Sequence, residues 1–221
     1  MPLITIIGAG AGLGLEIARA FGQRGFDVAL VARDQAKLGA LAATLEGEGI
    51  RARGFTADVS RPATITSALA EIKGALGPID VLEFSPADPS LAPVDVLDVT
   101  MENLQPQIDF YLGGALASVG AVLPDMIAAG NGAVLVTTGG GSISPMPFLG
   151  NVNIAAAGLR NWTLNLHDAL AEKGVYVAHV GITALIGAGH PDAEPDVIAR
   201  AYVKLYDERR DAELHHVAYD G

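Results

Sequence analysis

Short runs rich in aliphatic and β-branched residues alternate with longer segments of helical period along almost the whole chain. The short runs predict strands, and the longer segments carry apolar residues on one helical face. This alternation is typical of a parallel sheet with crossover helices. We therefore expect one α/β domain over residues 1–221, built on a doubly wound parallel sheet of six or seven strands.

The expected elements follow one another without a linker or an internal repeat. Strands are expected at 3–7, 27–32, 51–56, 79–83, 133–138 and 175–181, and the longest helices at 101–129, 153–173 and 195–208. The least regular segments, 84–99 and 182–194, each follow the carboxyl end of a strand. Open α/β sheets bind their ligands at that edge, so we expect the functional site there.

Composition narrows the range of partners. Half of the 221 residues are hydrophobic, which is enough for a sizeable core and excludes disorder of the whole chain. The formal net charge of −11 repels phosphate backbones and anionic lipid, so we expect neither a nucleic-acid nor a membrane partner. No uninterrupted apolar run reaches the roughly 18 to 20 residues of a membrane helix, and no signal-peptide layout is present, so a cytoplasmic location is expected.

A glycine-rich turn, Gly8-Ala-Gly-Ala-Gly12-Leu-Gly14, lies between the first expected strand and the first helix. It does not fit the dinucleotide fingerprint G-x-G-x-x-G, but it fits G-x-x-x-G-x-G. Gly8 permits a tight exit from the strand, Gly12 lets a pyrophosphate approach the backbone, and Gly14 lets the helix pack on the sheet. The position predicts a Rossmann-type nucleotide site, and the alternative is a merely flexible turn.

With this turn in place, the chain resembles the short-chain dehydrogenase/reductase family over nearly its whole length. Asp58-Val59 resembles the adenine-contacting pair of that family, and Phe84-Ser-Pro-Ala87 stands where the family has Asn-Asn-Ala-Gly, which leaves a backbone role for the loop. The resemblance implies cofactor contacts from Gly8, Ala11, Gly12, Leu13, Gly14, Arg33, Asp58, Val59 and Ser85.

The choice of cofactor rests on Arg33, at the end of the second expected strand. Its guanidinium can pair with a 2′-phosphate, whereas an acidic side chain at this point would bind the ribose hydroxyls of NAD. We therefore favour NADP(H) over NAD(H), although Ala11 replaces the second basic residue that the family often has. The alternatives are a solvated Arg33 and a helix N-cap role for Asp34.

The catalytic positions depart from the family. The resemblance implies a Tyr-x-x-x-Lys pair and a Ser, in which the Tyr transfers a proton, the Lys lowers its pKa and the Ser binds the substrate oxygen. None of the five tyrosines has a lysine four residues later. Alignment to the family places Val152 at the Tyr, Ala156 at the Lys and Gly139 at the Ser, so the three functional groups are missing.

Two residues are weak catalytic candidates. Tyr111 occupies the position of a family Asn and could face the space at Val152 and Ala156, or it could pack in the core; Ser142 could bind a substrate oxygen or be solvated. Other polar residues have ordinary interpretations: Asn151 and Asn153 as helix caps, His179 as a buried and satisfied histidine, and His215-His216 as a poor metal chelate, so no metal site is expected.

The sequence therefore predicts an NADP(H)-binding oxidoreductase of this kind with degenerate catalytic residues and an unknown small-molecule substrate. The alternatives are a non-catalytic dinucleotide-binding sensor or partner protein, and a non-redox enzyme such as a cyclase, lyase or isomerase. The helices at 101–129 and 153–173 carry more apolar residues than one buried stripe requires, and the resemblance implies that they form dimer faces. We expect a homodimer or homotetramer.

Overall fold

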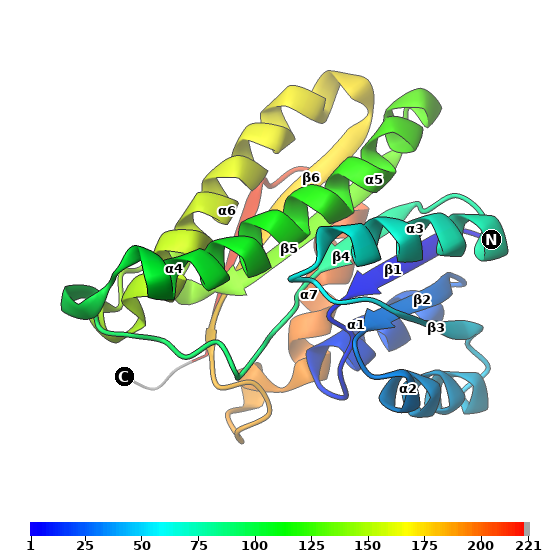
Figure 1. The fold of residues 1–221 in the computed structure, drawn as a ribbon. Helices are drawn as coiled ribbons and strands as arrows, with labels where there is room; N and C mark the ends of the chain where they lie inside the picture. The colour runs from blue at the N-terminus through cyan, green and yellow to red at the C-terminus, as the bar shows by residue number, and fades with distance from the viewer. Residues whose placement is uncertain (219–221) are drawn as a thin grey trace.

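A seven-stranded parallel sheet forms the centre of the computed structural model, which describes residues 1–218 (Figure 1). The strand order is β3-β2-β1-β4-β5-β6-β7, which is the expected doubly wound arrangement. The strands are β1 (Leu3–Ile7), β2 (Asp27–Ala32), β3 (Ala52–Thr56), β4 (Val81–Phe84), β5 (Gly132–Gly139), β6 (Val175–Ala184) and β7 (Glu213–Ala218). Tyr219 and the rest of 219–221, which the expected domain included, lie outside the described residues.

Two layers of helices cover the sheet, and each closes its own apolar cluster. One cluster contains α1 (Leu13–Gly22), α2 (Gln35–Gly47) and α7 (Pro195–Glu208). The other contains α3 (Pro62–Leu76), α5 (Gly114–Ala129) and α6 (Gly150–Leu170). Neighbouring strand residues alternate between the two clusters, as Ile6 and Ile7 do, because successive side chains of a strand point to opposite faces. The core therefore lies on both faces of the sheet.

The helix expected at 101–129 is interrupted. It consists of α4 (Met101–Ile108), a π-helical turn, η2 (Asp109–Gly113), and α5. A Cβ on Gly114, just after this turn, would lie 2.3 Å from Cγ1 of Val59, so only glycine allows the helix to approach the loop after β3 this closely. π-Helical turns are frequent at functional sites, and this one contains Tyr111.

The whole segment Met101–Ala129 is long and apolar enough to cross a membrane by length and composition alone, and a stretch of 18 residues within it has a mean hydropathy of 1.6. A count of uninterrupted apolar runs in the sequence underestimated how apolar this segment is on average. Within the described chain it packs on α3, α6 and the sheet, and one third of that stretch (33%) is buried. Figure 1 shows α5 lying along the sheet beside α6.

The expectation that Asn151 and Asn153 cap α6 is wrong, because the helix already begins at Gly150. Asn151 is fully buried and braces the long loop between β4 and α4. Its Oδ1 accepts the N–H of Val94 at 3.0 Å, and its Nδ2 donates to the carbonyl of Asn103 at 3.0 Å. Asn153 donates to the carbonyl of Met146. Both side chains therefore hold loops that border the carboxyl edge of the sheet.

Candidate functional site

A groove runs along the carboxyl edge of the sheet, at the point between β1 and β4 where the strand order reverses. It consists of two adjoining cavities of about 470 and 380 Å³. Both are lined by Gly8, Gly10, Pro86 and Ala87, so they meet over the glycine-rich turn. We call the larger cavity the β2 end and the smaller one the β5 end. Reversal points of this kind are where doubly wound sheets bind ligands.

The glycine-rich turn shapes the middle of the groove. Gly8 has φ +97°, and a Cβ there would lie 2.4 Å from Cα of Pro86, so this crossing of the two chain segments requires glycine. Gly14 packs against Ala9, where an added Cβ would lie 3.2 Å from its Cα. By contrast, a Cβ on Gly12 would meet nothing within 4 Å. Gly12 precedes the first turn of α1, whose free N–H groups attract anions.

Two basic side chains line the β2 end. Arg33 Nη1 lies 2.6 Å from Oδ2 of Asp88, which belongs to the loop after β4. Lys37 lines the same cavity, and its Nζ is 3.7 Å from Oδ2 of Asp34. Asp34 accepts hydrogen bonds from the N–H groups of Ala36 and Lys37. It therefore caps α2, which is the N-cap role that the sequence analysis gave as an alternative. Sequence reasoning missed Lys37, although it lies four residues after Arg33, one turn into the helix that Asp34 caps.

Asp58 and Val59 also line the β2 end, at the loop after β3. Oδ1 of Asp58 accepts the N–H of Ser60 at 3.0 Å and its hydroxyl at 2.7 Å, which fixes the carboxylate in a tight turn. Val59 is buried beneath the cavity. The remaining predicted contacts are distributed along the groove: Ala11 at the β2 end, and Leu13, Gly14 and Ser85 at the β5 end.

A buried carboxyl group lies behind the β5 end. Glu83 on β4 is fully buried, and it accepts hydrogen bonds from Ser85 Oγ at 2.9 Å and Thr137 Oγ1 at 3.1 Å. The Tyr202 hydroxyl is 2.6 Å from Thr137 Oγ1. Burial raises the pKa of Glu83 to about 8. Sequence reasoning missed this group. An acidic residue inside the apolar strand Val81–Phe84 is the feature that could have indicated it.

α6 supplies no proton-transferring pair. Between Gly150 and Leu170 it carries neither tyrosine nor lysine. Of the three positions that the sequence analysis matched to the family's Tyr, Lys and Ser, Val152 is half-buried, Ala156 is buried and Gly139 ends β5. The aliphatic surface of these residues cannot exchange a proton.

Of the two catalytic candidates, only Tyr111 lines the groove. It borders the β5 end, and its ring packs edge-to-face on Phe110 with centroids 5.2 Å apart. Burial raises its pKa, which keeps the phenol protonated. Ser142 is buried, not solvated, and its Oγ lies 2.7 Å from Thr138 Oγ1. The glycine run before Ser142 is closely packed, since a Cβ on Gly140 would lie 1.7 Å from Oγ1 of Thr183.

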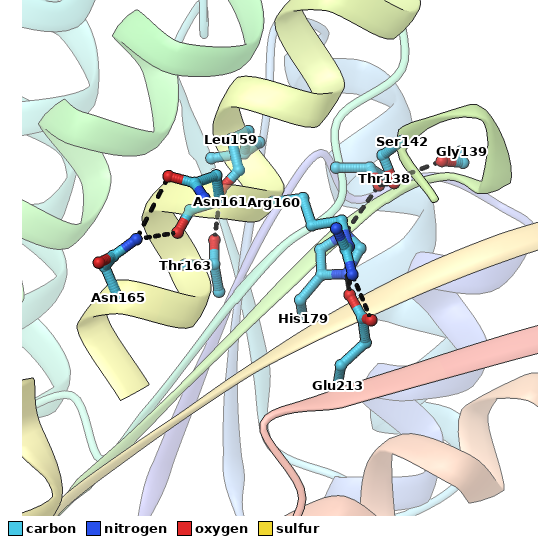
Figure 2. A network of polar contacts seen from close by, with 10 residues as sticks. All are labelled: Thr138, Gly139, Ser142, Leu159, Arg160, Asn161, Thr163, Asn165, His179 and Glu213. Carbon is cyan, nitrogen blue, oxygen red and sulfur yellow. Dashed lines mark hydrogen bonds and ion pairs between the residues drawn. The ribbon is translucent and has the colours of Figure 1, made fainter. Parts of the chain in front are cut away.

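A polar network runs from Thr138 across β6 to β7 (Figure 2). His179 is fully buried, with Nε2 2.8 Å from Thr138 Oγ1 and Nδ1 2.9 Å from Oε1 of Glu213. Arg160 of α6 donates to both Glu213 oxygens, at 2.5 and 2.7 Å. Burial lowers the pKa of His179, so the ring is neutral at pH 7. The expectation of a buried and satisfied histidine is confirmed. Thr138 lines the β5 end of the groove.

The two adjacent histidines of β7 make separate contacts. Nε2 of His215 lies 2.9 Å from Thr183 Oγ1, and Nε2 of His216 lies 2.7 Å from the carbonyl oxygen of Asp192. Neighbouring side chains on a strand point to opposite faces, so these two rings do not share a ligand.

Comparison with known proteins identifies the family. A profile described as "short chain dehydrogenase" matches residues 2–185. Dehydrogenase/reductase SDR family member 4 of Sus scrofa is 29% identical over 167 residues, which are 75% of this chain and 59% of that protein. Very-long-chain 3-oxoacyl-CoA reductase of Neurospora crassa is 30% identical over 185 residues, which are 82% of this chain and 55% of that protein. The chain thus spans less than two thirds of the length of either relative.

The fold has close structural counterparts. The crystal structure of a single-residue variant of actinorhodin polyketide ketoreductase with NADPH superimposes with a TM-score of 0.89 at 21% identity, covering 98% of this chain and 96% of that one. At this level of identity the likeness concerns the fold.

Proposed function

The chain belongs to the short-chain dehydrogenase family, and on that premise we propose that it binds NADP(H) in the groove and interconverts a small-molecule alcohol and its carbonyl compound. The observation that carries the proposal is the continuous groove between Arg33 and Thr138, which passes over the N-terminus of α1. When bound, the nicotinamide ring supplies or accepts a hydride. The relatives' names, a reductase and a dehydrogenase/reductase, point to the same chemistry.

The residues along the groove fit such a cofactor. Gly12 lines neither cavity, but it precedes α1 between Ala11 and Leu13, which do line them. No side chain of the described residues lies within 4 Å of a Cβ at Gly12, so a pyrophosphate can reach the N–H groups of α1 there. Asp58 and Val59 would border the adenine, while Arg33 and Lys37 would hold a 2′-phosphate through charge-assisted contacts. Two cations at this end favour NADP(H) over NAD(H).

We propose that Gly139, Val152 and Ala156 stand at the positions where other family members carry their proton-transfer groups. A missing general acid lowers the rate by roughly 10²- to 10⁴-fold, so we expect slow turnover of simple ketones. A non-catalytic sensor and a non-redox cyclase, lyase or isomerase are less favoured, because the polar residues Ser85, Thr137 and Thr138 are among those that line the β5 end. A site for binding alone would not need polar groups where a substrate oxygen would lie.

Cofactor preference is tested by titrating NADPH and NADH into the protein and following nicotinamide fluorescence. Arg33→Ala should weaken NADPH binding by about 1–3 kcal/mol and leave NADH binding nearly unchanged, because only NADPH carries the 2′-phosphate. Arg53→Ala is the matched control, since Arg53 is an exposed arginine on β3 that pairs with Glu71 outside the groove. Equal losses for both cofactors would contradict the role of Arg33.

Turnover is tested with the bound cofactor and a panel of aldehydes, ketones and 3-oxoacyl thioesters, with mass spectrometry of the products. The thioesters are included because a relative is named as a 3-oxoacyl-CoA reductase. Formation of the alcohol with loss of NADPH would support the proposal, and NADPH binding without any product would contradict it.

For assembly we propose a homodimer or homotetramer with two-fold symmetry and a cytoplasmic location. Exposed apolar side chains on the outer helices support the assembly: Leu116 (51%) and Ile127 (36%) on α5, and Ile154 (48%) on α6. Paired faces would cover them. Sedimentation that shows only a 22.7 kDa species would contradict the assembly.

A further inference from the structure

We propose that the Thr138 hydroxyl is the catalytic group of this protein, and that His179 and Glu213 form a relay behind it that takes up the proton released when a bound alcohol is oxidised. This inference rests on the proposed function and names the groups that replace the missing proton-transfer residues. Thr138 would touch the substrate, whereas His179 and Glu213 act through Thr138 as positioning residues.

The order of the hydrogen bonds supports a relay. His179 has one partner on each ring nitrogen: Glu213 at Nδ1 and Thr138 at Nε2. A carboxylate only accepts, so Nδ1 carries the proton and Nε2 is free to accept one from the Thr138 hydroxyl. The Ser142 hydroxyl, 2.7 Å from Thr138 Oγ1, then donates to Thr138. The single proton of Thr138 has two acceptors, Nε2 of His179 at 2.8 Å and the Gly139 carbonyl at 3.2 Å, and the His179 contact is the shorter one. Hydroxyl, imidazole and carboxylate stand in the sequence that activates hydroxyl groups in other enzymes.

The position of the network also supports it. Thr138 lines the β5 end of the groove, while His179 behind it is fully buried. Thr138 is 4% exposed, and it is the partner of Nε2 that also lines the groove, so it joins His179 to the β5 end. On the far side, the Glu213 side chain is 26% exposed, which gives the relay an outlet to solvent. Figure 2 shows this line of side chains beneath α6, the helix that carries no tyrosine or lysine.

The groups around His179 leave its ring neutral and therefore able to accept a proton. Glu213 on β7 favours the charged ring, while Arg160 on α6 and His215 on β7 oppose it. Burial has the largest effect and lowers the pKa of His179, so the ring is neutral at pH 7. Arg160, held by both Glu213 oxygens, keeps that carboxylate ionised and in place.

The step balances with an oxidised nicotinamide dinucleotide as the oxidant. The alcohol carbon loses a hydride to the oxidant, and its C–O bond becomes a carbonyl. The alcohol proton passes to Thr138 Oγ1 while the Thr138 proton passes to Nε2 of His179. The imidazolium then releases a proton to solvent along Glu213. Reduction of the carbonyl is the reverse of these transfers.

The first test removes the hydroxyl without changing the shape of the side chain. Thr138→Val should lower kcat for oxidation of 2-propanol, cyclohexanol or 3-hydroxybutyryl-CoA with NADP⁺ by about 10²-fold or more, and Thr138→Ser should retain turnover. Thr163→Val is the matched control: Thr163 is a fully buried threonine that donates to the Leu159 carbonyl and is not among the residues that line the groove. Thr138→Val turnover within about threefold of the parent would overturn the relay.

The second test uses the pH profile. In the parent, kcat for oxidation should fall as the pH drops through the pKa of His179, because the protonated ring cannot accept a proton. His179→Gln should remove this acid limb, and His167→Gln, which changes a histidine bonded to the Val177 carbonyl, should leave it. An unchanged acid limb in folded His179→Gln would overturn the relay.

The third test needs no turnover. Nitrogen NMR of the ring should give a lower His179 pKa with NADP⁺ than with NADPH, because only the oxidised nicotinamide ring is positively charged and Thr138 opens on the groove. Identical His179 pKa values in both complexes would overturn the relay. Absence of turnover in the parent would overturn the proposed function and the relay together, whereas turnover that survives in Thr138→Val would overturn the relay alone.

Discussion

The region of β1, β2 and β3 brings a glycine-rich turn and charged side chains to the groove, whereas the region of β5, α6 and β6 brings hydroxyl and aliphatic side chains. In the first region, the glycine-rich turn, the capped α2 and the loop after β3 form the β2 end of the groove. In the second, α6 carries aliphatic groups at Val152 and Ala156, and the polar groups lie on the strands beneath it.

The difference follows from what each task requires. Dinucleotide binding relies on backbone N–H groups, glycines and one or two cations, which a chain keeps if its turns are kept. Proton transfer relies on a few side-chain groups, and single substitutions remove them. Under the proposed function, the second region has lost its usual groups while the first stays intact, and another hydroxyl near the same edge of the sheet takes over.

The largest effect is expected from Gly12→Val, which should abolish dinucleotide binding by filling the space for the pyrophosphate. The variant should fold, because an added Cβ at Gly12 meets no atom within 4 Å. Nicotinamide fluorescence measures the loss, and Gly74→Val, at an equally open glycine of α3, is the control. A folded Gly12→Val protein that still binds NADPH would show that the first region is not the cofactor site.

A gain of activity tests the second region. Val152→Tyr with Ala156→Lys and Gly139→Ser should raise ketone reduction by about 10²-fold, because it restores a phenol beside an ammonium. Gly139 has room for a side chain, whereas Ala156 is 2% exposed and its neighbours must shift. Thermal unfolding checks that the triple variant folds. Unchanged ketone reduction in a folded triple variant would contradict the alignment of α6.

The buried carboxyl between the two regions predicts a pH effect on stability. The pKa of Glu83 is about 8 in the fold, against an ordinary value of 4.5. Between these values the folded chain holds a proton that the unfolded chain releases, so stability should fall by about 1.4 kcal/mol for each pH unit of increase. The effect is absent below pH 4.5 and constant above about pH 8.

Chemical denaturation of Glu83→Gln at several pH values checks this effect. The variant should lose the decrease in stability, whereas Glu102→Gln, an exposed residue of α4, should keep it. A slope that is the same in Glu83→Gln and the parent would show that Glu83 does not hold a proton in the fold.

The smallest effect is expected from Tyr111→Phe. Its ring packs on Phe110 and its pKa is raised by burial, so the phenol is a poor proton donor. Turnover should change by less than about threefold and NADPH affinity should stay the same, because the ring is retained. Steady-state kinetics measure this. A complete loss of turnover would assign the chemistry to Tyr111 and not to Thr138.

Features that depend on residues close together in the sequence could be predicted from it. The alternation of strands and helices predicted the sheet and both layers, and the turn from Gly8 to Gly14 marked the groove. The π-helical turn at Asp109–Gly113 did not follow, because the apolar residues of 101–129 keep a helical spacing through it.

Features that join distant residues could not be predicted. Thr138 and His179 are 41 residues apart, and His179 and Glu213 are 34 apart, so only the pairing of β5, β6 and β7 brings them together. Asp88 meets Arg33 across 55 residues because only β1 separates β2 from β4 in the sheet. The sequence position of His179 predicted that the ring is buried, but it did not predict the two hydrogen-bond partners on which its proposed role depends.

The separation of binding from proton transfer is tested most directly by measuring NADPH affinity and alcohol oxidation on the same preparations of Gly12→Val and Thr138→Val. Gly12→Val should lose both, because no cofactor is bound. Thr138→Val should keep the affinity of the parent and lose turnover. A Thr138→Val protein that loses affinity and turnover in parallel, or keeps both, would contradict the separation.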